Sequence, residues 1–268
     1  MIVKEVLARS IITKSGLPDS DYVINPYVGC QHGCIYCYAR FMKRFTNHKE
    51  KWGEFIDVKM NSPDLIPKTS SYKGRTVCIS SVTDPYQAIE KKYGLMRGIL
   101  EKLVPLQPKL CILTKSDLIT RDIDLIKRMK SCKAGLSISV NDDRIRKEVE
   151  PFAPSIEKRT EALKELKKAG IRTFVFISPM FPELTDWKTI VRKTEKYADE
   201  MWFENLNVRG YNWNDIRKWL KSKHPELLKK YEEVYFTKNG YWNGIEKEIR
   251  QYCRERGIKH SVYFHHSR

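Results

Sequence analysis

Long apolar runs are absent from this sequence: none approaches the roughly 20 consecutive apolar residues that a membrane-spanning helix needs. The first residues, MIVKEVLARSIITKSG, mix charged residues into the apolar positions and lack the core and cleavage site of a secretory signal. Low-complexity linkers and short-period repeats are also absent. These absences argue against a membrane protein and predict a cytoplasmic one.

Acidic residues are scarce relative to basic ones. Only 33 Asp and Glu stand against 50 Lys and Arg, so the 268-residue chain has a formal net charge of +17. Such an excess attracts polyanions, and nucleic acid is therefore the partner to consider first. The alternative is a solvated Lys- and Glu-rich surface with an incidental basic bias, because no single stretch is dense enough to form a disordered basic arm.

The cysteines are odd in number, 7 in all, so they cannot all pair within the chain. A reducing cytosol also disfavours structural disulfides. Three of them, Cys30, Cys34 and Cys37, lie close together in GCQHGCIYCYAR, and no further Cys/His pair follows at the spacing of a zinc site. Three thiolates suit a [4Fe–4S] cluster whose fourth iron stays open to an external ligand.

The rest of the chain alternates short β-branched or aromatic runs with amphipathic helical stretches. Six such units begin at DYVINPYVG, TVCISS, LCILT, AGLSISV, IRTFVFIS and EMWFENL, and the first continues into the helical stretch IYCYARFMKRF. This order predicts parallel strands with helical crossovers, in a partial or complete α/β barrel or a doubly wound sheet. We expect one domain over residues 1–240 and a C-terminal helix–strand extension over 241–268 packed on it.

Polar residues follow the predicted strands at their carboxyl ends, where parallel α/β folds collect their chemistry. The segments are SSVTDPYQ, TKSD and SISVNDD, and the candidate side chains are Ser81, Thr83, Asp84, Lys115, Ser139 and Asn141. Together at one rim they would form a ligand site. Each alone is a common loop or capping residue, and Asp84 before a proline is also a candidate helix N-cap.

The motif CxxxCxxC, with Tyr36 before its last cysteine, resembles the signature of the radical S-adenosylmethionine superfamily. The segments NPYVGCQHGCIYCYAR, SSVTDPYQAIEKKYGLMRGILEKL, LTKSDLITRDIDLI and VEPFAPSIEKRTEALKELKKAGI resemble its spore photoproduct lyase-like branch. This resemblance covers about residues 10–182. It implies an α/β fold with a partial (β/α)6 barrel, one [4Fe–4S] cluster on the three cysteines, and S-adenosylmethionine at the open iron.

The resemblance also implies the reaction and the roles of the candidate residues. Reductive cleavage of S-adenosylmethionine gives a 5′-deoxyadenosyl radical that abstracts hydrogen from a substrate, with electrons from a donor such as flavodoxin or ferredoxin. Ser81, Thr83 and Asp84 match the loop that receives the methionyl amine, and Lys115 matches a lysine that neutralises the carboxylate. Tyr36, Ser139 and Asn141 complete the cofactor-facing set.

Two further residues of the matching segments are open to more than one interpretation. Arg159 in EKRTEAL could clamp a carboxylate, because a guanidinium pairs bidentately, or be an exposed helix arginine. Glu150 in VEP is interpreted only as a residue of a strand-to-helix turn.

True spore photoproduct lyases carry a hydrogen-donating cysteine at the position of Ser81, and a hydroxyl O–H bond is too strong for that role. The splitting of thymine photoproducts is therefore not expected. By simple strand alternation Cys78 points away from Ser81, and Cys111 shares a face with Lys115 but lies four residues earlier. Neither cysteine is expected to replace the donor; like Cys132 and Cys253, they are interpreted as small buried hydrophobic residues.

The sequence therefore predicts a radical enzyme, of lyase or transferase/oxidoreductase type, that modifies or repairs nucleic acid. The stretch YNWNDIRKWLKSKH could stack bases on Tyr211, Trp213 and Trp219, unless it is an amphipathic helix whose tryptophans face the core. The alternatives are a radical enzyme acting on a peptide or small metabolite, and a non-catalytic iron–sulfur redox sensor.

Overall fold

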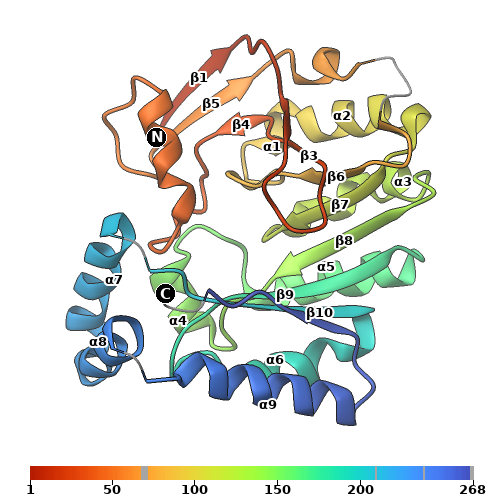
Figure 1. Cartoon of the computed structure of the whole chain (residues 1–268). Helices are drawn as coiled ribbons and strands as arrows, with labels where there is room; N and C mark the ends of the chain where they lie inside the picture. The colour runs from red at the N-terminus through yellow and green to blue at the C-terminus, as the bar shows by residue number, and fades with distance from the viewer. Residues whose placement is uncertain (68–71, 209, 238, 266–268) are drawn as a thin grey trace.

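A mostly parallel, eight-stranded sheet runs through the molecule in the order β11-β10-β9-β8-β7-β6-β3-β2 (Figure 1). The computed structural model describes residues 1–67, 72–208, 210–237 and 239–265. The strands are β2 (Ile12–Lys14), β3 (Tyr22–Ile24), β6 (Thr76–Ile79), β7 (Lys109–Thr114), β8 (Cys132–Ser137), β9 (Arg172–Met180), β10 (Glu200–Asn205) and β11 (His260–Val262). Within this sheet, as far as the structure describes it, β2 pairs antiparallel with β3 and the other neighbouring strands pair in parallel.

A second, smaller sheet has the order β1-β5-β4 and contains β1 (Ile2–Val6), β4 (Tyr27–Val28) and β5 (Phe55–Lys59). Strand β1 pairs with β5 in parallel, and β4 pairs with β5 antiparallel. The sequence analysis did not predict this sheet. It lies at the N-terminal side of the molecule and supports the segment that leads into the three cysteines (Figure 1).

Helices follow the strands of the large sheet in turn. They are η1 (Tyr38–Phe45), η2 (Ser62–Leu65), α1 (Glu90–Tyr93), α2 (Leu95–Leu103), η4 (Val104–Leu106), η5 (Asp117–Asp122), α3 (Ile123–Ile126), α4 (Asp143–Val149), α5 (Ile156–Lys168), α6 (Trp187–Thr194), η6 (Glu195–Tyr197), α7 (Gly210–Lys223), η7 (Pro225–Leu227), α8 (Leu228–Phe236) and α9 (Tyr241–Glu255). In the described part of the chain none of them has the length and apolar content to cross a membrane.

Alternation along the strands separates a helix-facing side from the barrel interior. In β7, Leu110 and Ile112 belong to the core that packs under the helices, and Ala162 and Leu166 of α5 join the same core. Helix α5 begins at Ile156 and is capped by Ser155, whose Oγ accepts a hydrogen bond from the N–H of Lys158 at 3.3 Å. The parallel sheet is thus covered by helices, as a buried parallel sheet requires.

The predicted α/β partial barrel with its six strand-then-helix units is confirmed by β3, β6, β7, β8, β9 and β10 and the helices that follow them. The helix predicted over 35–45 is shorter in the structure and of a different type: it is a 3₁₀ helix that begins only after Cys37. The three cysteines lie before this helix, and the backbone there is closed by the hydrogen bonds from Gly33 to Cys30 and from Cys37 to Cys34. Beyond β10, α9 leads into β11, which pairs with β10 in parallel and extends the sheet.

Candidate functional site

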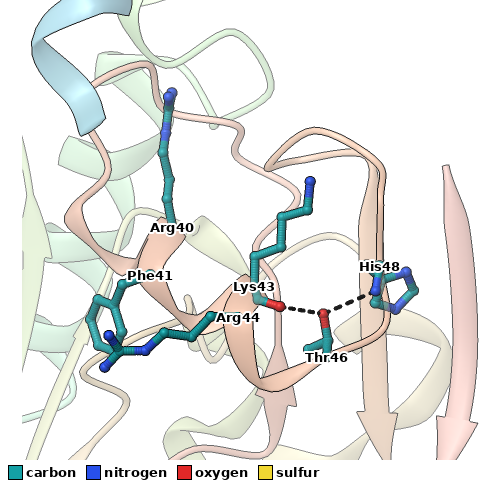
Figure 2. Close-up of a pocket in the computed structure, with 6 residues that line it drawn as sticks. All are labelled: Arg40, Phe41, Lys43, Arg44, Thr46 and His48. Atoms are coloured by element: carbon teal, nitrogen blue, oxygen red, sulfur yellow. Dashed lines mark hydrogen bonds between the residues drawn. The ribbon is translucent and has the colours of Figure 1, made fainter. Parts of the chain in front are cut away.

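The three cysteines lie in one loop, residues 29–37, between β4 and η1, and we call it the cysteine loop. The N–H of Gly33 donates to the carbonyl of Cys30 at 3.3 Å, and the N–H of Cys37 donates to that of Cys34 at 3.2 Å. Cys30 and Cys34 are buried, Cys37 is half-buried, and all three are free thiols. Figure 2 shows the η1 segment that continues from this loop.

Backbone hydrogen bonds tie the cysteine loop to the segment around α4. The N–H of Ile35 donates to the carbonyl of Val149 at 3.0 Å, and the N–H of Phe152 donates to the carbonyl of His32 at 3.4 Å. The loop therefore joins the first strand-to-helix connection to the fourth.

Two glycines permit the close packing of the cysteine loop. Gly29 has φ +92°, and a Cβ there would lie 2.4 Å from the carbonyl oxygen of Phe55. Gly53 has φ +97°, and its Cβ would lie 2.8 Å from the Cα of Gly33. Neither position accepts a side chain without a shift of backbone, because both neighbours are main-chain atoms.

Burial raises the pKa of all three thiols. For Cys30, burial is reinforced by the negative charge of Asp84, and for Cys34 burial raises the pKa to about 12. The pKa of Cys37 is raised by burial although Lys115 acts to lower it. Thiols in this state keep their protons until a metal displaces them, so loading of metal releases protons from the loop.

Asp84 joins the loops that follow β6 and β7 to the cysteine loop. Its Oδ1 accepts from the N–H of Tyr86 at 2.9 Å and from Oγ1 of Thr114 at 2.6 Å. Its Oδ2 accepts from the backbone N–H of Lys115 at 2.8 Å and lies 3.1 Å from Nε2 of His32. Burial acts to raise the pKa of Asp84, but His32 and these hydrogen bonds lower it to about 2. The carboxylate is therefore ionised and held by several partners.

The interpretation of Asp84 as a helix N-cap is wrong, because the N-cap of α1 is Ile89, five residues later. Its carboxylate closes a turn instead. Thr83 donates from Oγ1 to the carbonyl of Gly29 at 2.6 Å, and so joins this turn to the cysteine loop. Ser81 donates from its N–H to Oδ1 of Asn25 at 3.0 Å.

Glu150 is a second centre of polar contacts, which the sequence analysis interpreted only as a turn residue. It is fully buried, and its Oε1 accepts from the hydroxyl of Tyr36 and from Oγ of Ser139 at 2.8 Å. Its Oε2 accepts from Nη2 of Arg159 at 2.5 Å, and Nζ of Lys115 lies 3.9 Å from Oε1. Burial acts to raise the pKa of Glu150, but Arg159 and Lys115 lower it to about 2.

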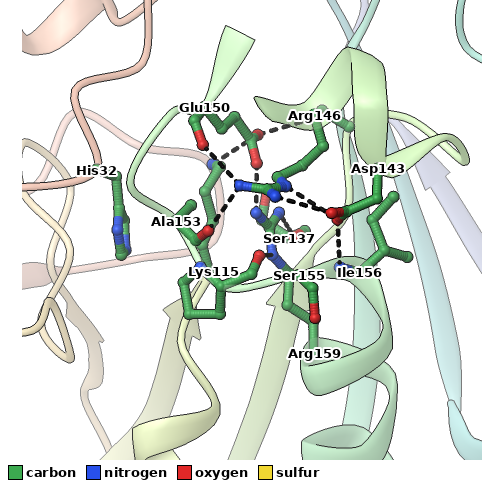
Figure 3. A network of polar contacts seen from close by, with 12 residues as sticks. His32, Lys115, Ser137, Asp143, Arg146, Glu150, Ala153, Ser155, Ile156 and Arg159 are labelled. Carbon is green, nitrogen blue, oxygen red and sulfur yellow. Dashed lines mark hydrogen bonds and ion pairs between the residues drawn. The ribbon is translucent and has the colours of Figure 1, made fainter. Parts of the chain in front are cut away.

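Arg159 is held inside the protein, so its interpretation as an exposed helix arginine is wrong. Besides Glu150, its guanidinium donates to the carbonyls of Ser137 at 2.9 Å and Pro154 at 3.0 Å (Figure 3). The carboxylate that it clamps here belongs to the chain itself. No sequence signal could have found this pair, because a Glu in a turn and an Arg on a helix are individually ordinary.

Lys115, Tyr36 and Ser139, predicted separately from three segments, are brought together by Glu150. Burial acts to lower the pKa of Lys115, but Glu150 raises it overall, so the lysine stays cationic. Its Nζ also lies 5.8 Å from the centre of the Tyr36 ring. A cation and a carboxylate are therefore both present beside the cysteine loop.

Asn141 has a different neighbourhood from the other candidates. Its Oδ1 accepts the N–H of Asp186 at 3.1 Å, which ties the loop after β8 to the loop after β9. It lines a cavity of about 420 Å³, whose wall also includes Met180, Trp187 and Trp242.

Cys78 and Cys111 are register partners on adjacent strands. The alternation that separated Cys78 from Ser81 does not apply, because β6 ends at Ile79 and Ser80 has φ +62°. Cys78 is half-buried and Cys111 is buried, so only the second matches the expected buried thiol closely.

Of the two tryptophans proposed for base stacking, Trp219 faces the interior and Trp213 is half-buried. Trp219 is 8% exposed and packs in a core cluster with Ile216, Leu220 and Tyr231. Trp213 packs on the ring of Phe236 with centroids 5.1 Å apart. The side chain of Tyr211 lies outside the described part of the structure. For Trp219 the alternative interpretation, an amphipathic helix packed on a core, is the correct one.

The chemistry of these residues fits a cluster bound by three thiolates. In the described ranges no three His, Cys, Asp or Glu side chains are grouped as one metal ion would require. A cubane instead distributes its thiolates over different irons. His32 in the same loop has a buried Nδ1 without a hydrogen-bond partner among the described residues, so a polar group of a bound molecule could be accommodated there.

Comparison with protein families agrees with this assignment. The family model described as the radical SAM superfamily matches residues 24–192, which include the cysteine loop and β6 to β9.

Two relatives illustrate the range of similarity. An uncharacterized protein of Methanocaldococcus jannaschii is 42% identical over 245 residues, which are 91% of each protein. A protein of Pseudomonas phage M6, named radical SAM Nα-GlyT isomerase, is 27% identical over 235 residues, which are 84% of this chain and 47% of the phage protein.

Among solved structures, spore photoproduct lyase complexed with dinucleoside spore photoproduct aligns with a TM-score of 0.74 at 17% identity, over 98% of this chain and 82% of the lyase. A variant of the lyase with bound AdoMet and the same dinucleoside aligns with a TM-score of 0.72 at 16% identity, over the same shares of both chains. At these identities the likeness shows a common fold.

Proposed function

Because the chain belongs to the radical S-adenosylmethionine superfamily, we propose that Cys30, Cys34 and Cys37 bind its cluster and that its substrate is nucleic acid, which it modifies or repairs. The protein is a radical S-adenosylmethionine enzyme, with a [4Fe–4S] cluster and S-adenosylmethionine as cofactors and with a need for an electron donor. When bound, these cofactors supply a 5′-deoxyadenosyl radical that abstracts hydrogen from the substrate. One observation carries the proposal: three free thiols, of which Cys30 and Cys34 are buried and Cys37 is half-buried, share one loop beside Lys115 and Glu150.

The proposed roles of the chain's own residues follow from their contacts. Lys115 offers an ammonium group to the carboxylate of the methionyl moiety, and Glu150 holds that ammonium in place. Asp84 fixes the backbone of Lys115 and is the proposed partner of the methionyl amine. Thr83 holds the cysteine loop against the Asp84 turn.

Most of the remaining proposed cofactor-binding residues shape the site by holding other side chains in place. Tyr36 and Ser139 both donate to Glu150, so they shape the same wall of the site. Arg159 acts through Glu150, since its donors are used within the chain. Ser81 and Asn141 stay proposed contacts of the cofactor, at the ends of β6 and β8.

Nucleic acid as the substrate is supported by charge and by the comparisons. The net charge of +17 favours a polyanion. The structural neighbour with a TM-score of 0.74 is complexed with a dinucleoside. Ser81 at the position of the lyase's donor cysteine argues for a reaction other than dimer splitting.

The test is deuterium transfer into 5′-deoxyadenosine by the anaerobically reconstituted, dithionite-reduced protein. Deuterated oligonucleotides, peptides and metabolite extract are offered separately. Transfer from an oligonucleotide supports the proposal, whereas transfer only from a peptide or metabolite rejects the nucleic-acid substrate. Intact S-adenosylmethionine under all conditions would leave a redox sensor as the function.

Three further proposals concern the setting of the enzyme. Free thiols in a reducing environment favour a cytoplasmic location, where flavodoxin or ferredoxin can supply the electron. The third proposal is that residues 241–268, of which the structure describes 241–265, are an extension packed on the domain over 1–240, and the pairing of β11 with β10 supports it.

A further inference from the structure

Exposed aromatic side chains gather around the cysteine loop. Among the described residues, Tyr38, Phe45 and Phe152 belong to this group, with exposed fractions of 45%, 66% and 71%. Phe236, 60% exposed, lies on a different element, α8. Tyr38 and Phe45 open and close η1, directly after the last cysteine of the loop. The Phe152 ring lies against the loop at Gly33, 3.2 Å from a Cβ built there. Isolated exposed apolar residues are common, but a group beside one site indicates a binding surface.

Basic residues accompany these rings. Residues 38–52, YARFMKRFTNHKEKW, contain Arg40, Lys43, Arg44, Lys49 and Lys51 against a single acid, Glu50. The formal charge of this segment is therefore five positive charges less one, or +4 with neutral histidine.

Arg44 stacks on two rings of the segment. Its guanidinium carbon lies 4.7 Å from the centre of the Phe45 ring and 5.4 Å from that of Phe41. Figure 2 shows Arg44 beside Phe41 at the edge of a cavity of about 490 Å³, which Lys43 also lines. A guanidinium held on aromatic faces is pre-positioned to meet a phosphate or a base.

The acids near this surface are already engaged. Glu50 and Asp57 lie 2.9 and 2.8 Å from the two ring nitrogens of His48. Asp215 pairs with Arg40, which points away from Arg44 (Figure 2). Nζ of Lys43 donates to the carbonyl of Lys49 at 2.8 Å. Within the described ranges no Asp or Glu is recorded in an ion pair with Lys43 or Arg44, so no carboxylate neutralises their charges.

We propose that a surface formed by Tyr38, Lys43, Arg44, Phe45 and Phe152, which we call the loop rim, binds single-stranded nucleic acid beside the reacting nucleotide. Bases stack on the exposed rings and phosphates meet Lys43 and Arg44, the combination by which proteins bind unpaired strands. The inference rests on the proposed function and places its substrate. It also replaces α7 as the stacking surface, because Trp219 is buried there.

The experiment measures the binding of a labelled single-stranded oligonucleotide of about 12 nucleotides to the anaerobic, cluster-loaded protein over a range of salt. DNA and RNA oligomers are separate arms. The double variant K43E/R44E is expected to bind at least about tenfold more weakly, with a salt slope lower by about two phosphate contacts. Phe45→Ala is expected to bind about tenfold more weakly with an unchanged salt slope, because it removes a stacking surface.

Two control variants make the same kinds of substitution outside the loop rim. K109E/K130E makes the same charge change on exposed lysines near the amino ends of β7 and β8, away from the cysteine loop. Phe236→Ala removes an exposed ring of α8. Both are expected to bind within about twofold of the wild type. Iron content and the urea midpoint show whether each variant is folded.

A second readout does not depend on substitution. Photocrosslinking with an oligomer that carries a thio-substituted base is expected to label peptides from 38–52 and the peptide with Phe152. Equal binding by all variants together with crosslinks elsewhere overturns the loop rim and leaves the proposed function intact if deuterium is still transferred from an oligonucleotide. Failure of the wild type to bind any oligonucleotide, or equal competition by polyglutamate, overturns both.

Discussion

At the scale of single residues, the site depends on buried charges that hold one another. Glu150 and Arg159 are both fully buried, and each would carry a large desolvation cost alone. The other partners of Glu150, Tyr36 and Lys115, come from distant parts of the sequence. The sequence could predict that Tyr36, Lys115 and Ser139 belong to the site. It could not predict Glu150 as their common partner, because long-range contacts decide that role.

Glu150→Gln is expected to lower the free energy of unfolding by about 3–5 kcal/mol, because it leaves Arg159 buried without a counter-charge. Arg159→Met is expected to lower the free energy of unfolding by a similar amount, because it leaves the buried carboxylate of Glu150 without this counter-charge. The double variant E150Q/R159M should lose less than the sum of the two. Urea unfolding of the metal-free, reduced protein measures all three.

The exposed Glu157→Gln on the same helix is the control, with a change within about 0.5 kcal/mol. Strict additivity of the two buried substitutions would contradict a direct pair.

Gly53→Ala is expected to impair the cysteine loop, since the added Cβ would lie 2.8 Å from the Cα of Gly33. The expected result is a clear loss of iron and sulfide per protein after reconstitution. Gly74→Ala provides the matched control: Gly74 also has positive φ, +76°, but no atom lies within 4 Å of its added Cβ. Equal iron content in both variants would show that the close contact between Gly53 and Gly33 is not needed for cluster binding.

At the scale of elements, local patterns predicted strands better than the connections between them. The β-branched runs TVCISS and LCILT became β6 and β7, because a buried parallel strand needs such residues. The small sheet β1-β5-β4 escaped prediction, since its strands are far apart in the sequence: Ile2 of β1 pairs with Phe55 of β5, and Tyr27 of β4 pairs with Val58 of β5. The 3₁₀ form of η1 likewise depends on how the preceding turns place its first residue.

Helix α4 offers a prediction about acid stability. Asp143 accepts hydrogen bonds from Nε and Nη2 of Arg146 at 2.9 and 2.8 Å and from the N–H of Ile156 at 3.2 Å. The hydrogen bonds from Arg146 lower the pKa of Asp143 below its usual 3.8. A lowered pKa adds stability that is present above the unfolded-state pKa and is lost as the pH falls through the folded-state value.

The unfolding free energy of Asp143→Asn should therefore lie below that of the wild type near neutral pH. The difference should shrink as the pH falls below about 4, when the wild-type carboxylate takes up its proton. Urea unfolding at several pH values measures this, with Glu157→Gln as the charge-matched comparison. A difference that stays constant down to the lowest pH would contradict the ion pair.

At the scale of the whole molecule, the fold gathers loops from separate units around one face. The cysteine loop, the Asp84 turn and the Glu150 segment are joined by Thr83, Lys115 and Tyr36. The rule that the carboxyl ends of parallel strands meet at one rim predicted that the loops with Asp84 and Lys115 lie near the cysteine loop. It did not predict the part played by the Glu150 segment. The excess of basic residues predicted a polyanionic partner but not the surface that binds it. That surface depends on which aromatic residues remain exposed after folding.

The most direct measurement is Mössbauer spectroscopy of ⁵⁷Fe-reconstituted protein before and after addition of S-adenosylmethionine. The account predicts a [4Fe–4S] signal in which one iron site changes its parameters when S-adenosylmethionine is added, and loss of that signal in Cys37→Ala. Four iron sites unaffected by S-adenosylmethionine, or stoichiometric zinc in place of iron, would contradict it.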